Sequence, residues 1–369
     1  MRPGVTLAMI VKDGGEKLRR CLQSAKGVVD EIVVVDTGSS DDSLEVARSL
    51  GCRTDEIEWP DAFDEARNHS LSLVETEWVL VLDADEWLAE GAAEALKSAI
   101  ADDTAAGFLV FCQDLQRDGS FTEMELVRLF RSHPEVRFRG AIHEQIDQSE
   151  LKRLTGRPNI PRSEVRFFHD GYVEPASDES LRRDVRLLKK ELERRPGSLY
   201  HECLLASVLT DLGEPEGKVR QRRLVKLLLE RAEEPSPPDE QLALILVREL
   251  YALGPYEFAT NRTASLIEVC YKWFSDYPKV VFAVGEFEIR RQNAPGGLRA
   301  FKRLAEMAET GRYSRHTSFP SAILGEALWG PLGILAKVCG ERELAKRALL
   351  RALEIDPANE AARAHLEGL

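Results

Sequence analysis

Residues 6–41 read TLAMIVKDGGEKLRRCLQSAKGVVDEIVVVDTGSSD, and their pattern of apolar residues predicts the class of fold. Two short apolar runs, LAMIV at 7–11 and EIVVV at 31–35, enclose a segment at 16–26 whose apolar residues recur at helical spacing. Nearly continuous apolar runs are typical of strands that are buried on both faces of a mostly parallel sheet. We therefore predict a strand, a helix and a second strand, the repeating unit of a doubly wound α/β domain.

The same alternation continues outward from this stretch. A second helix is predicted at 41–50, and a third at 63–74 precedes the apolar strand WVLVL at 78–82, with room for a short strand between the two helices. Later strands are predicted at 108–112 and 126–131, and their short connection favours an antiparallel pair. The fold class is thus α/β, with a doubly wound sheet that is mixed.

The strand signals end near residue 177, and helical patterns replace them. Apolar residues in 181–192 are three and four positions apart, as in an amphipathic helix. Further helices are predicted at 200–212 and 220–232, and the proline-rich segment EEPSPPDE at 233–240 is predicted to be a loop. We predict an α/β domain at 1–176 and an α-helical repeat-like domain at 177–369.

The C-terminal segment ERELAKRALLRALEIDPANEAARAHL, residues 341–366, resembles the second helix and exit turn of a tetratricopeptide repeat. Its small residues Ala345, Ala348 and Ala352 suit close contact between helices. Aromatic residues gather between Tyr251 and Tyr277, and we assign most of them to the core of the helical domain. A helical-repeat domain is therefore expected, without a regular array.

Composition excludes several classes of protein. The 369 residues carry 63 acidic and 50 basic side chains, a formal net charge of −13 that opposes binding to a phosphate backbone. Nucleic acid is therefore excluded as the main partner. The apolar runs are too short to span a bilayer, and the N-terminus does not resemble a signal peptide. We expect a cytoplasmic location, where the six widely spaced cysteines are free thiols.

Acidic residues follow three of the predicted strands. Asp13 follows the first strand, the cluster at 36–41 follows the second, and Asp83 and Asp85 follow the strand at 78–82. Ligands of open α/β sheets bind beyond the carboxyl ends of the strands. Like charges at one edge repel one another, and Mg²⁺ or Mn²⁺ carrying a phosphorylated ligand would resolve this conflict. The alternative is that Asp83, Asp85 and the residue after them only cap a helix at 90–99.

The segment at 6–88, which contains VDTGSSD, EARN and LDADE, resembles the nucleotide-sugar-binding half of family 2 glycosyltransferases with a GT-A fold. The resemblance covers residues 6–88 most closely. With these motifs, the later RGAIHEQ at 139–145 and the repeat tail, the chain is similar to the bacterial subfamily that includes peptide S-glycosyltransferases. The resemblance implies an inverting, metal-dependent glycosyltransferase that uses a nucleoside diphosphate sugar, with UDP-sugar as the favoured donor. In place of the Asn-Glu-Glu of many relatives the chain has Asp13-Gly14-Gly15, so no contact is assigned to Asp13.

The resemblance assigns five residues to the nucleotide sugar. Asp36 would contact the nucleoside, and Asp41 would lie on the same rim. Arg67 and Asn68 of EARN would face the nucleotide, because a planar guanidinium suits phosphate. Asp83 would contribute to both the nucleotide sugar and the metal. The alternative for Arg67 and Asn68 is that they are surface positions of a helix.

The metal ligands implied by the resemblance are Asp83, Asp85 and a histidine, with Asp85 the more direct of the two carboxylates. The segment FHDGY resembles the HYGY of relatives, which favours His169 as the third ligand and leaves His143 as the rival. An inverting transferase also needs a base to take the proton of the acceptor. Glu144 is the first candidate for this base, and His143 is the second.

Two classes of function remain open. In the first, the α/β domain transfers a sugar to a peptide, protein or small-molecule acceptor held by the helical domain. In the second, the chain is an interaction protein whose repeats do the work and whose sugar-nucleotide module is inactive. The intact acidic cluster favours the enzyme, because its mutual repulsion is unfavourable and an inactive module would have no reason to keep it. A surface of stacked helices is equally compatible with binding an acceptor, for which we favour a peptide or protein with Cys, Ser or Thr as the modified residue, and with forming a homodimer.

Overall fold

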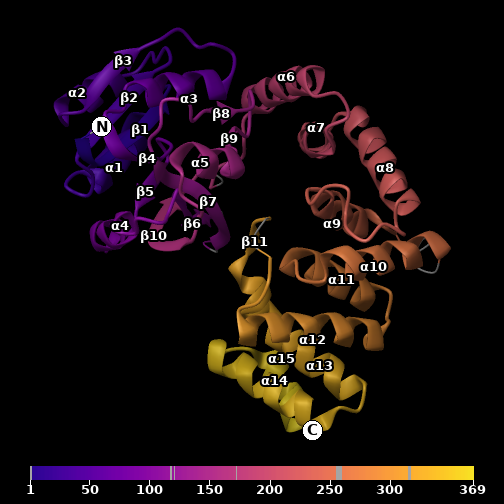
Figure 1. The fold of residues 1–369 in the computed structure, drawn as a ribbon. Helices are drawn as coiled ribbons and strands as arrows, with labels where there is room; N and C mark the ends of the chain where they lie inside the picture. The colour runs from indigo at the N-terminus through magenta and orange to yellow at the C-terminus, as the bar shows by residue number, and fades with distance from the viewer. Residues whose placement is uncertain (1, 117–118, 120, 172, 255–259, 315–316) are drawn as a thin grey trace. The chain divides into compact units, whose positions relative to one another are not determined.

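The computed structural model describes residues 2–116, 119, 121–171, 173–254, 260–314 and 317–369. The chain forms two compact units that divide between Arg195 and Pro196 (Figure 1). The division lies one helix later than the predicted boundary at 176/177. The helix at 178–194 belongs to the first unit because its side chains contact residues of that unit, as described below.

The strands of the first unit form a mixed sheet and a small separate ribbon. They are β1 (Arg2–Val11), β2 (Glu31–Asp36), β3 (Arg53–Glu56), β4 (Thr76–Val81), β5 (Glu86–Leu88), β6 (Gly107–Leu115), β7 (Phe121–Arg131), β8 (Phe138–Arg139), β9 (Gln145–Ile146) and β10 (Arg162–His169). The main sheet has the order β3-β2-β1-β4-β7-β6-β10-β5, and β8 pairs with β9 in the ribbon. The predicted α/β class with a mixed sheet is confirmed.

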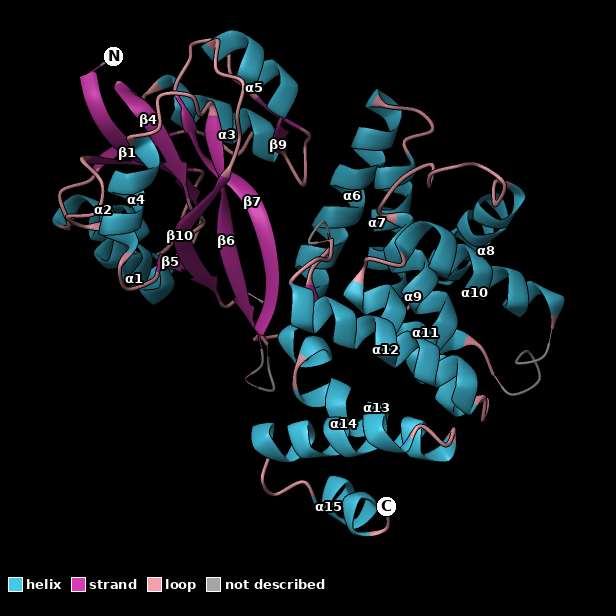
Figure 2. Ribbon diagram, turned by 60° about the horizontal axis from the view of Figure 1, so that its bottom comes forward, coloured by secondary structure: helices cyan, strands magenta, loops and turns pink. Residues whose placement is uncertain are grey.

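Helices cover both faces of this sheet (Figure 2). They are α1 (Gly15–Ala25), α2 (Ser43–Ser49), α3 (Phe63–Ser72), α4 (Ala92–Ile100) and α5 (Gln148–Thr155). The last helix of the unit, α6 (Asp178–Arg194), follows them in the chain. Side chains of β1 alternate between the two faces: Leu7 and Met9 pack in one core with α1, α2 and α4, whereas Ala8 and Ile10 pack in the cores that include residues of α5 and α3. The fold is therefore doubly wound, as the apolar runs predict.

Strand direction brings three strand ends to one edge. β1 pairs in parallel with β2 and with β4, in a register that aligns Val11 with Asp36 and Ala8 with Val81. β7 runs antiparallel to β4. Arg131 at the end of β7 donates its backbone N–H to Ala106, just before β6, at 2.8 Å, which is the contact of an antiparallel hairpin. The acidic residues that follow β1, β2 and β4 therefore share the carboxyl edge.

The second unit is a series of helices, as predicted. They are α7 (Leu199–Asp211), α8 (Pro215–Glu230), α9 (Leu242–Ala252), α10 (Asn261–Phe274), α11 (Pro278–Arg290), α12 (Ala294–Thr310), α13 (Glu326–Val338), α14 (Arg342–Ile355) and α15 (Glu360–Glu367), with the two-residue strand β11 (Phe319–Pro320) and the 3-10 turn η2 (Ser321–Leu324) between α12 and α13. The proline-rich segment at 233–240 is a loop of turns and bends. Of the aromatic residues assigned to the core, Trp273, Phe274 and Tyr277 are buried and Tyr251 is exposed. Tyr256 and Phe258 lie outside the described residues.

Three neighbouring helix pairs of this unit each have a glycine at their closest approach. A Cβ atom on Gly217 would lie 2.5 Å from the backbone nitrogen of Thr210, one on Gly285 would lie 2.8 Å from the ring of Phe301, and one on Gly333 would lie 2.6 Å from Leu349. A side chain at these positions would push the helices apart, because protein interiors leave no spare volume. The pairs α7–α8, α11–α12 and α13–α14 therefore share one packing device, in keeping with a tetratricopeptide-like unit.

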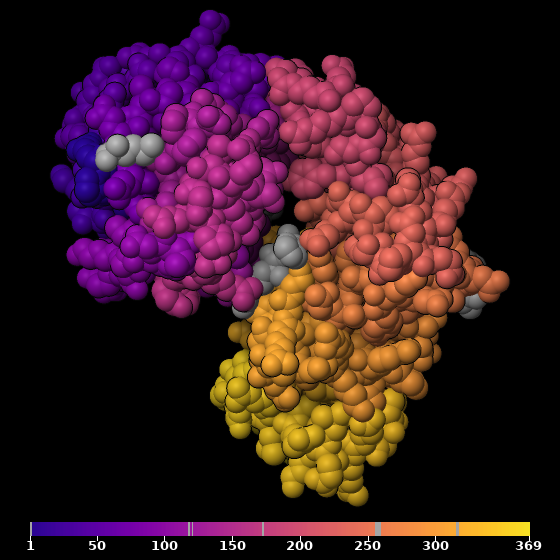
Figure 3. All heavy atoms as spheres, in the orientation of Figure 1, coloured from indigo at the N-terminus to yellow at the C-terminus, as the bar shows by residue number. Residues whose placement is uncertain are grey.

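One stretch of the described residues, 321–338, is long and apolar enough to cross a membrane by length and composition alone. Leu328, Leu332 and Ala336 of this stretch are buried in the core of the helical unit. Figure 3 draws the atoms of this unit as spheres, from pink through orange to yellow. Of the whole stretch, 39% is buried inside the structure.

Candidate active site

Asp36 lies at the end of β2, at the carboxyl edge of the sheet. Its Oδ1 atom accepts the backbone N–H groups of Gly38 and Ser39, both at 2.7 Å, which fold the following turn over the carboxylate. Its Oδ2 atom is buried and has no hydrogen-bond partner among the described residues. A buried polar atom without a partner is costly. Asp36 therefore presents one acceptor that a ligand can satisfy.

Asp41 and Asp13 connect two loops of this edge. Asp13 accepts the backbone N–H of Ser40 at 2.6 Å, and Asp41 accepts the backbone N–H of Gly15 at 3.0 Å. The loop after β1 is thus tied to the loop after β2 in both directions. Both aspartates are exposed, and their hydrogen bonds join the two loops. The structure therefore places Asp41 on the rim near Asp36, with both oxygens already engaged, since Oδ1 accepts the backbone N–H of Ser43 at 3.0 Å.

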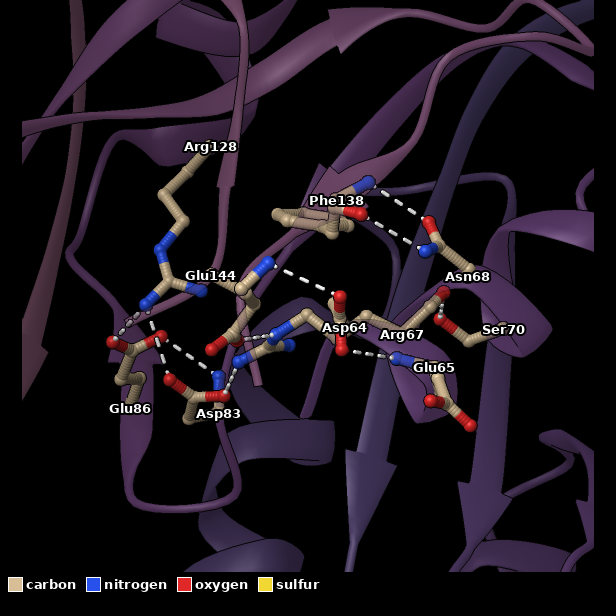
Figure 4. A network of polar contacts seen from close by, with 11 residues as sticks. Asp64, Glu65, Arg67, Asn68, Ser70, Asp83, Glu86, Arg128, Phe138 and Glu144 are labelled. Carbon is tan, nitrogen blue, oxygen red and sulfur yellow. Dashed lines mark hydrogen bonds and ion pairs between the residues drawn. The ribbon is translucent and has the colours of Figure 1, made fainter. Parts of the chain in front are cut away.

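Arg67 of α3 is buried and joins two of the predicted site residues (Figure 4). Its Nε atom donates to Oε1 of Glu144, and its Nη2 atom donates to Oδ1 of Asp83. Burial opposes the charge of the guanidinium, but the two carboxylates more than offset this and raise the pKa of Arg67. The motifs EARN, LDADE and RGAIHEQ thus meet at one side chain. The sequence predicts that Arg67 faces the nucleotide, whereas the structure gives it two carboxylate partners.

A second arginine, Arg128 of β7, completes this cluster. It belongs to none of the motifs from which site residues were predicted. Its Nη2 atom lies 3.0 Å from Oδ2 of Asp83 and 3.2 Å from Oε1 of Glu86. The register that pairs Leu80 with Leu129 carries Arg128 to the end of β4. The sequence shows only that Arg128 is a charged residue inside a predicted strand. The pairing of β7 with β4 is needed to show which residues it contacts.

The two arginines determine the charge of the cluster. Burial alone would raise the pKa of Asp83, yet Arg67 and Arg128 outweigh burial and hold that pKa well below its usual range. Glu86 accepts the backbone N–H of Asp83 at 2.7 Å and is buried, and its burial raises its pKa to about 7 in spite of Arg128. Asp83 is therefore an ionised carboxylate with both oxygens bound to guanidinium groups.

Helix α3 also holds the segment that carries Glu144. Asn68 uses both ends of its amide on Phe138, because Oδ1 accepts the backbone N–H at 2.8 Å and Nδ2 donates to the carbonyl at 3.0 Å. Asp64 accepts the backbone N–H of Gly140 at 3.1 Å. Asn68 is thus a structural clamp in the structure, which differs from its predicted contact with the nucleotide.

Further contacts from α3 reach the same segment. The backbone N–H of Phe63 donates to the carbonyl of Ala141 at 2.9 Å, and Arg67 binds Glu144. The side chain of Glu144 is largely enclosed, with 11% of its area exposed. His143, by contrast, is exposed and has a φ of 53°, which is rare for a residue with a side chain. The polar residues of EARN and of RGAIHEQ are therefore one assembly, in which Glu144 is fixed and His143 is turned outward.

Asp85 and His169 face one another beside this cluster. His169 follows from β10, whose register aligns it with Asp114 of β6 and Glu86 of β5. Its Nδ1 atom is 2.7 Å from Oδ1 of Asp114, and its Nε2 atom is 3.4 Å from Oδ2 of Asp85. Burial opposes the charge of the imidazole, but the two aspartates raise the pKa of His169 to about 10. Asp114 is the partner that orients the ring, and the sequence analysis did not identify it.

The Asp85–His169 pair fits a divalent cation. Two neighbouring ligands of an octahedral ion that is bound at about 2.1 Å lie about 3 Å apart, which is close to the separation of this pair. Gly171 leaves the space beside them open, since a Cβ atom there would clash with Nε2 of His169 and would lie 2.8 Å from Oδ2 of Asp85. Among the described residues no group of three or more His, Cys, Asp and Glu side chains is arranged to hold a metal. Of the three predicted ligands, the structure brings together Asp85 and His169, and turns Asp83 to the arginines.

Helix α1 supports the segment that contains His169. Asp170 accepts a hydrogen bond from Arg20 at 2.8 Å and forms an ion pair with Lys17 at 3.1 Å. The guanidinium of Arg20 also lies 3.7 Å from the ring centre of Trp87. A backbone hydrogen bond from Asp170 to the carbonyl of Asp85, at 3.3 Å, ties the two strand ends together. The pair Asp85–His169 is thus held from outside by α1.

Comparison with protein families agrees with the predicted resemblance. Residues 6–152 match the family described as Glycosyl transferase family 2. The match includes α3 and ends beyond Glu144. It therefore contains every residue of the cluster formed by Arg67, Asp83, Glu86, Arg128 and Glu144. The predicted resemblance to family 2 glycosyltransferases is confirmed for this segment.

Two curated relatives extend beyond the family match. A TPR repeat-containing protein of Synechococcus elongatus is 35% identical over 237 residues, which cover 63% of this chain and 58% of that protein. The SPbeta prophage-derived glycosyltransferase SunS of Bacillus subtilis is 24% identical over 205 residues, which cover 53% of this chain and 46% of that protein. The chain thus spans about half the length of the curated relatives that it matches.

Among solved structures, residues 1–349 of TarS from S. aureus in complex with UDP-GlcNAc match with a TM-score of 0.37 and 13% identity. The match covers 85% of this chain and 93% of that one.

Proposed function

We propose, on the premise that residues 6–152 form a family 2 glycosyltransferase domain, that this protein transfers a sugar from a UDP-sugar to the nucleophile of an acceptor, with inversion at the anomeric carbon. One observation carries the proposal. Arg67 joins Asp83 of the LDADE motif to Glu144 of the RGAIHEQ motif at the carboxyl edge of the sheet. The group that we assign to the donor and the group that we assign to the acceptor are therefore held by one side chain.

The nucleotide sugar would lie along the carboxyl edge of β1, β2 and β4. The buried Oδ2 atom of Asp36 would accept a hydrogen bond from the nucleoside, with Asp41 on the same rim. Asp83, fixed by Arg67 and Arg128, would accept from a sugar hydroxyl of the donor. Because both arginines are already paired with carboxylates, we assign their role to fixing Asp83 and Glu144.

Asp85 and His169 would hold the divalent cation, Mn²⁺ or Mg²⁺. Carboxylate and imidazole donors suit these ions, which share their remaining positions with phosphate oxygens and water. When bound, the cation would offset the charge that grows on the diphosphate as the sugar leaves. His169 must give up its proton at Nε2 to act as a ligand, and Asp114 would keep the ring oriented through Nδ1.

Glu144 would act as the general base. Arg67 holds Oε1, so we assign Oε2 to receive the proton of the acceptor nucleophile as it attacks the anomeric carbon. The enclosed position of Glu144 restricts access of bulk water to the site. This suits a transferase, because water that attacks the anomeric carbon would hydrolyse the donor in competition with transfer to the acceptor. His143 is the second candidate, and its outward position favours contact with the acceptor over proton transfer.

The helical unit would hold the acceptor. Stacked helical pairs present extended surfaces that suit a peptide or protein segment, and we propose Cys, Ser or Thr as the modified residue. A homodimer formed by this unit would be an alternative use of the same surface.

Release of UDP tests the enzymatic function without knowledge of the acceptor. The full chain is incubated with UDP-glucose and with UDP-GlcNAc, with Mn²⁺ or with EDTA, and UDP is measured. We expect slow UDP release from at least one donor, because water replaces the absent acceptor, and we expect EDTA to abolish it. If neither donor is hydrolysed and neither donor shifts the melting temperature, the chain is better explained as an interaction protein.

A further inference from the structure

Helix α6 is the last element of the first unit and leads within two residues into the second. Its acidic residue Glu191 is buried, with 1% of its area exposed. A buried carboxylate is costly unless hydrogen bonds and charges compensate it. Glu191 therefore needs partners that compensate the burial of its carboxylate.

Glu191 binds the segment that carries the proposed base. Its Oε1 atom accepts the backbone N–H of Ala141 at 2.9 Å, and it lies 3.0 Å from Nη1 of Arg194. Ala141 is completely buried, so water cannot replace this acceptor. Two residues separate Ala141 from Glu144 along a segment with left-handed φ angles at Gly140 and His143. Such a turn needs contacts from outside to keep one conformation.

Helix α6 is itself anchored to the entrance of α3. Arg186 forms an ion pair with Asp61 at 2.6 Å, and Lys190 donates to the backbone carbonyl of Asp61 at 2.8 Å. Arg194 lies 3.7 Å from Glu65 of α3. The helix that holds Ala141 and the helix that holds Glu144 are therefore connected to each other at several points.

We propose that Glu191 is a positioning residue for the transfer step. It would act through the N–H of Ala141 to keep the 138–144 segment, and with it the carboxylate of Glu144, in the reactive position. The catalytic consequence rests on the proposed function of Glu144. Helix α6 runs directly into the helical unit, so Glu191 lies on the element that joins the two units along the chain.

Three variants of the full chain test the proposal. Glu191→Ala removes the acceptor for Ala141, whereas Glu191→Gln keeps an oxygen of nearly the same reach. Glu193→Ala is the matched control, because Glu193 lies on the same helix and is exposed. The measurements are hydrogen–deuterium exchange of residues 138–146 and the kcat and KM for UDP release from UDP-GlcNAc or UDP-glucose with Mn²⁺.

We expect Glu191→Ala to increase deuterium uptake in residues 138–146 and to lower kcat about ten- to a hundredfold, as a misplacement near 1 Å does, while KM for the donor stays near wild type. Glu191→Gln should restore both readouts, and Glu193→Ala should match wild type. If Glu191→Ala does not fold, Glu191→Asp withdraws the acceptor by one methylene and keeps the charge, and it should show the same two effects.

Two results would overturn the positioning role. One is unchanged deuterium uptake in residues 138–146 in the Ala or Asp variant, whatever its activity. The other is a Gln variant as defective in kcat as the Ala variant, since that would make charge the important property. Increased uptake together with a wild type that releases no UDP would instead count against the proposed function and leave the contact of Glu191 with the segment established.

Discussion

At the scale of single residues, the site depends on how a buried arginine and a half-buried one, Arg67 and Arg128, distribute their contacts. Arg67 binds Asp83 and Glu144, and Arg128 binds Asp83 and Glu86. Removal of one member of a buried ion pair leaves an uncompensated charge, and its cost is far larger than the net stabilisation by the pair. The arginines therefore control both the stability and the geometry of the site.

Arg67→Met should destabilise the protein strongly, by about 3–5 kcal/mol, because Asp83 and Glu144 would lose their shared partner. Urea denaturation of the variant and of the wild type measures this difference. Arg53→Met, at an exposed arginine of β3, is the control and should cost less than about 1 kcal/mol. A small effect of Arg67→Met would mean that the two carboxylates do not depend on this guanidinium.

Glu144→Gln retains size and loses basicity. We expect kcat for UDP release to fall by about 10²- to 10⁴-fold while the affinity for UDP stays near wild type. Steady-state kinetics and calorimetric titration with UDP supply the two readouts. Retained activity in Glu144→Gln together with loss in His143→Ala would assign the base to His143.

At the scale of elements, much of the first unit follows from its sequence. Apolar runs and strand-end motifs predict β1, β2, β4 and the helices between them, since local patterns reflect burial on both sheet faces. Arg128 and Asp114 could not be found in this way, because their roles come from the pairing of β7 with β4 and of β10 with β6. The boundary of the units also depends on long-range contacts, made by the side chains of α6.

A chain that ends after Arg195 should fold as a unit, whereas a chain that ends after Ser177 should not reach the same stability. The shorter chain lacks Glu191 and would leave the N–H of Ala141 buried without its acceptor, which costs about 1–3 kcal/mol before any loss of packing. Thermal denaturation followed by circular dichroism compares the two. Equal melting temperatures would place the boundary of the first unit at 176/177, as the sequence predicts.

The glycines between helices of the second unit allow a matched pair of substitutions in α13. Gly333→Ala would place a methyl group against Leu349 and should destabilise the protein by about 1–3 kcal/mol, as overpacking does. Gly330→Ala meets its nearest atom at 3.8 Å and should be neutral or stabilising by up to about 1 kcal/mol, because alanine favours a helix. Chemical denaturation of both variants measures the difference, and equal effects would contradict the close approach of α13 and α14.

At the scale of the whole molecule, the chain combines an α/β unit, which contains the match to family 2 glycosyltransferases, with a helical unit that is continuous with it through α6. The sequence predicts this combination from one change of pattern near residue 177 and from the repeat-like C-terminus. It does not specify the acceptor, because a helical surface is defined by side chains from several helices that are far apart in the chain. The residues that we assign to the donor can be predicted from the sequence more directly, because they follow strands of one sheet.

We propose that Asp85 and His169 link a divalent cation to the nucleotide of the donor, and the melting temperature with UDP, with Mn²⁺ and with both together tests this link. A ligand that binds only the native state stabilises it by about 2.7 kcal/mol at a hundredfold excess over Kd. We predict that UDP and Mn²⁺ together raise the melting temperature well beyond the sum of their separate effects, and that Asp85→Ala abolishes this synergy while the variant remains folded. A full shift with UDP alone, or synergy that persists in Asp85→Ala, would contradict the account.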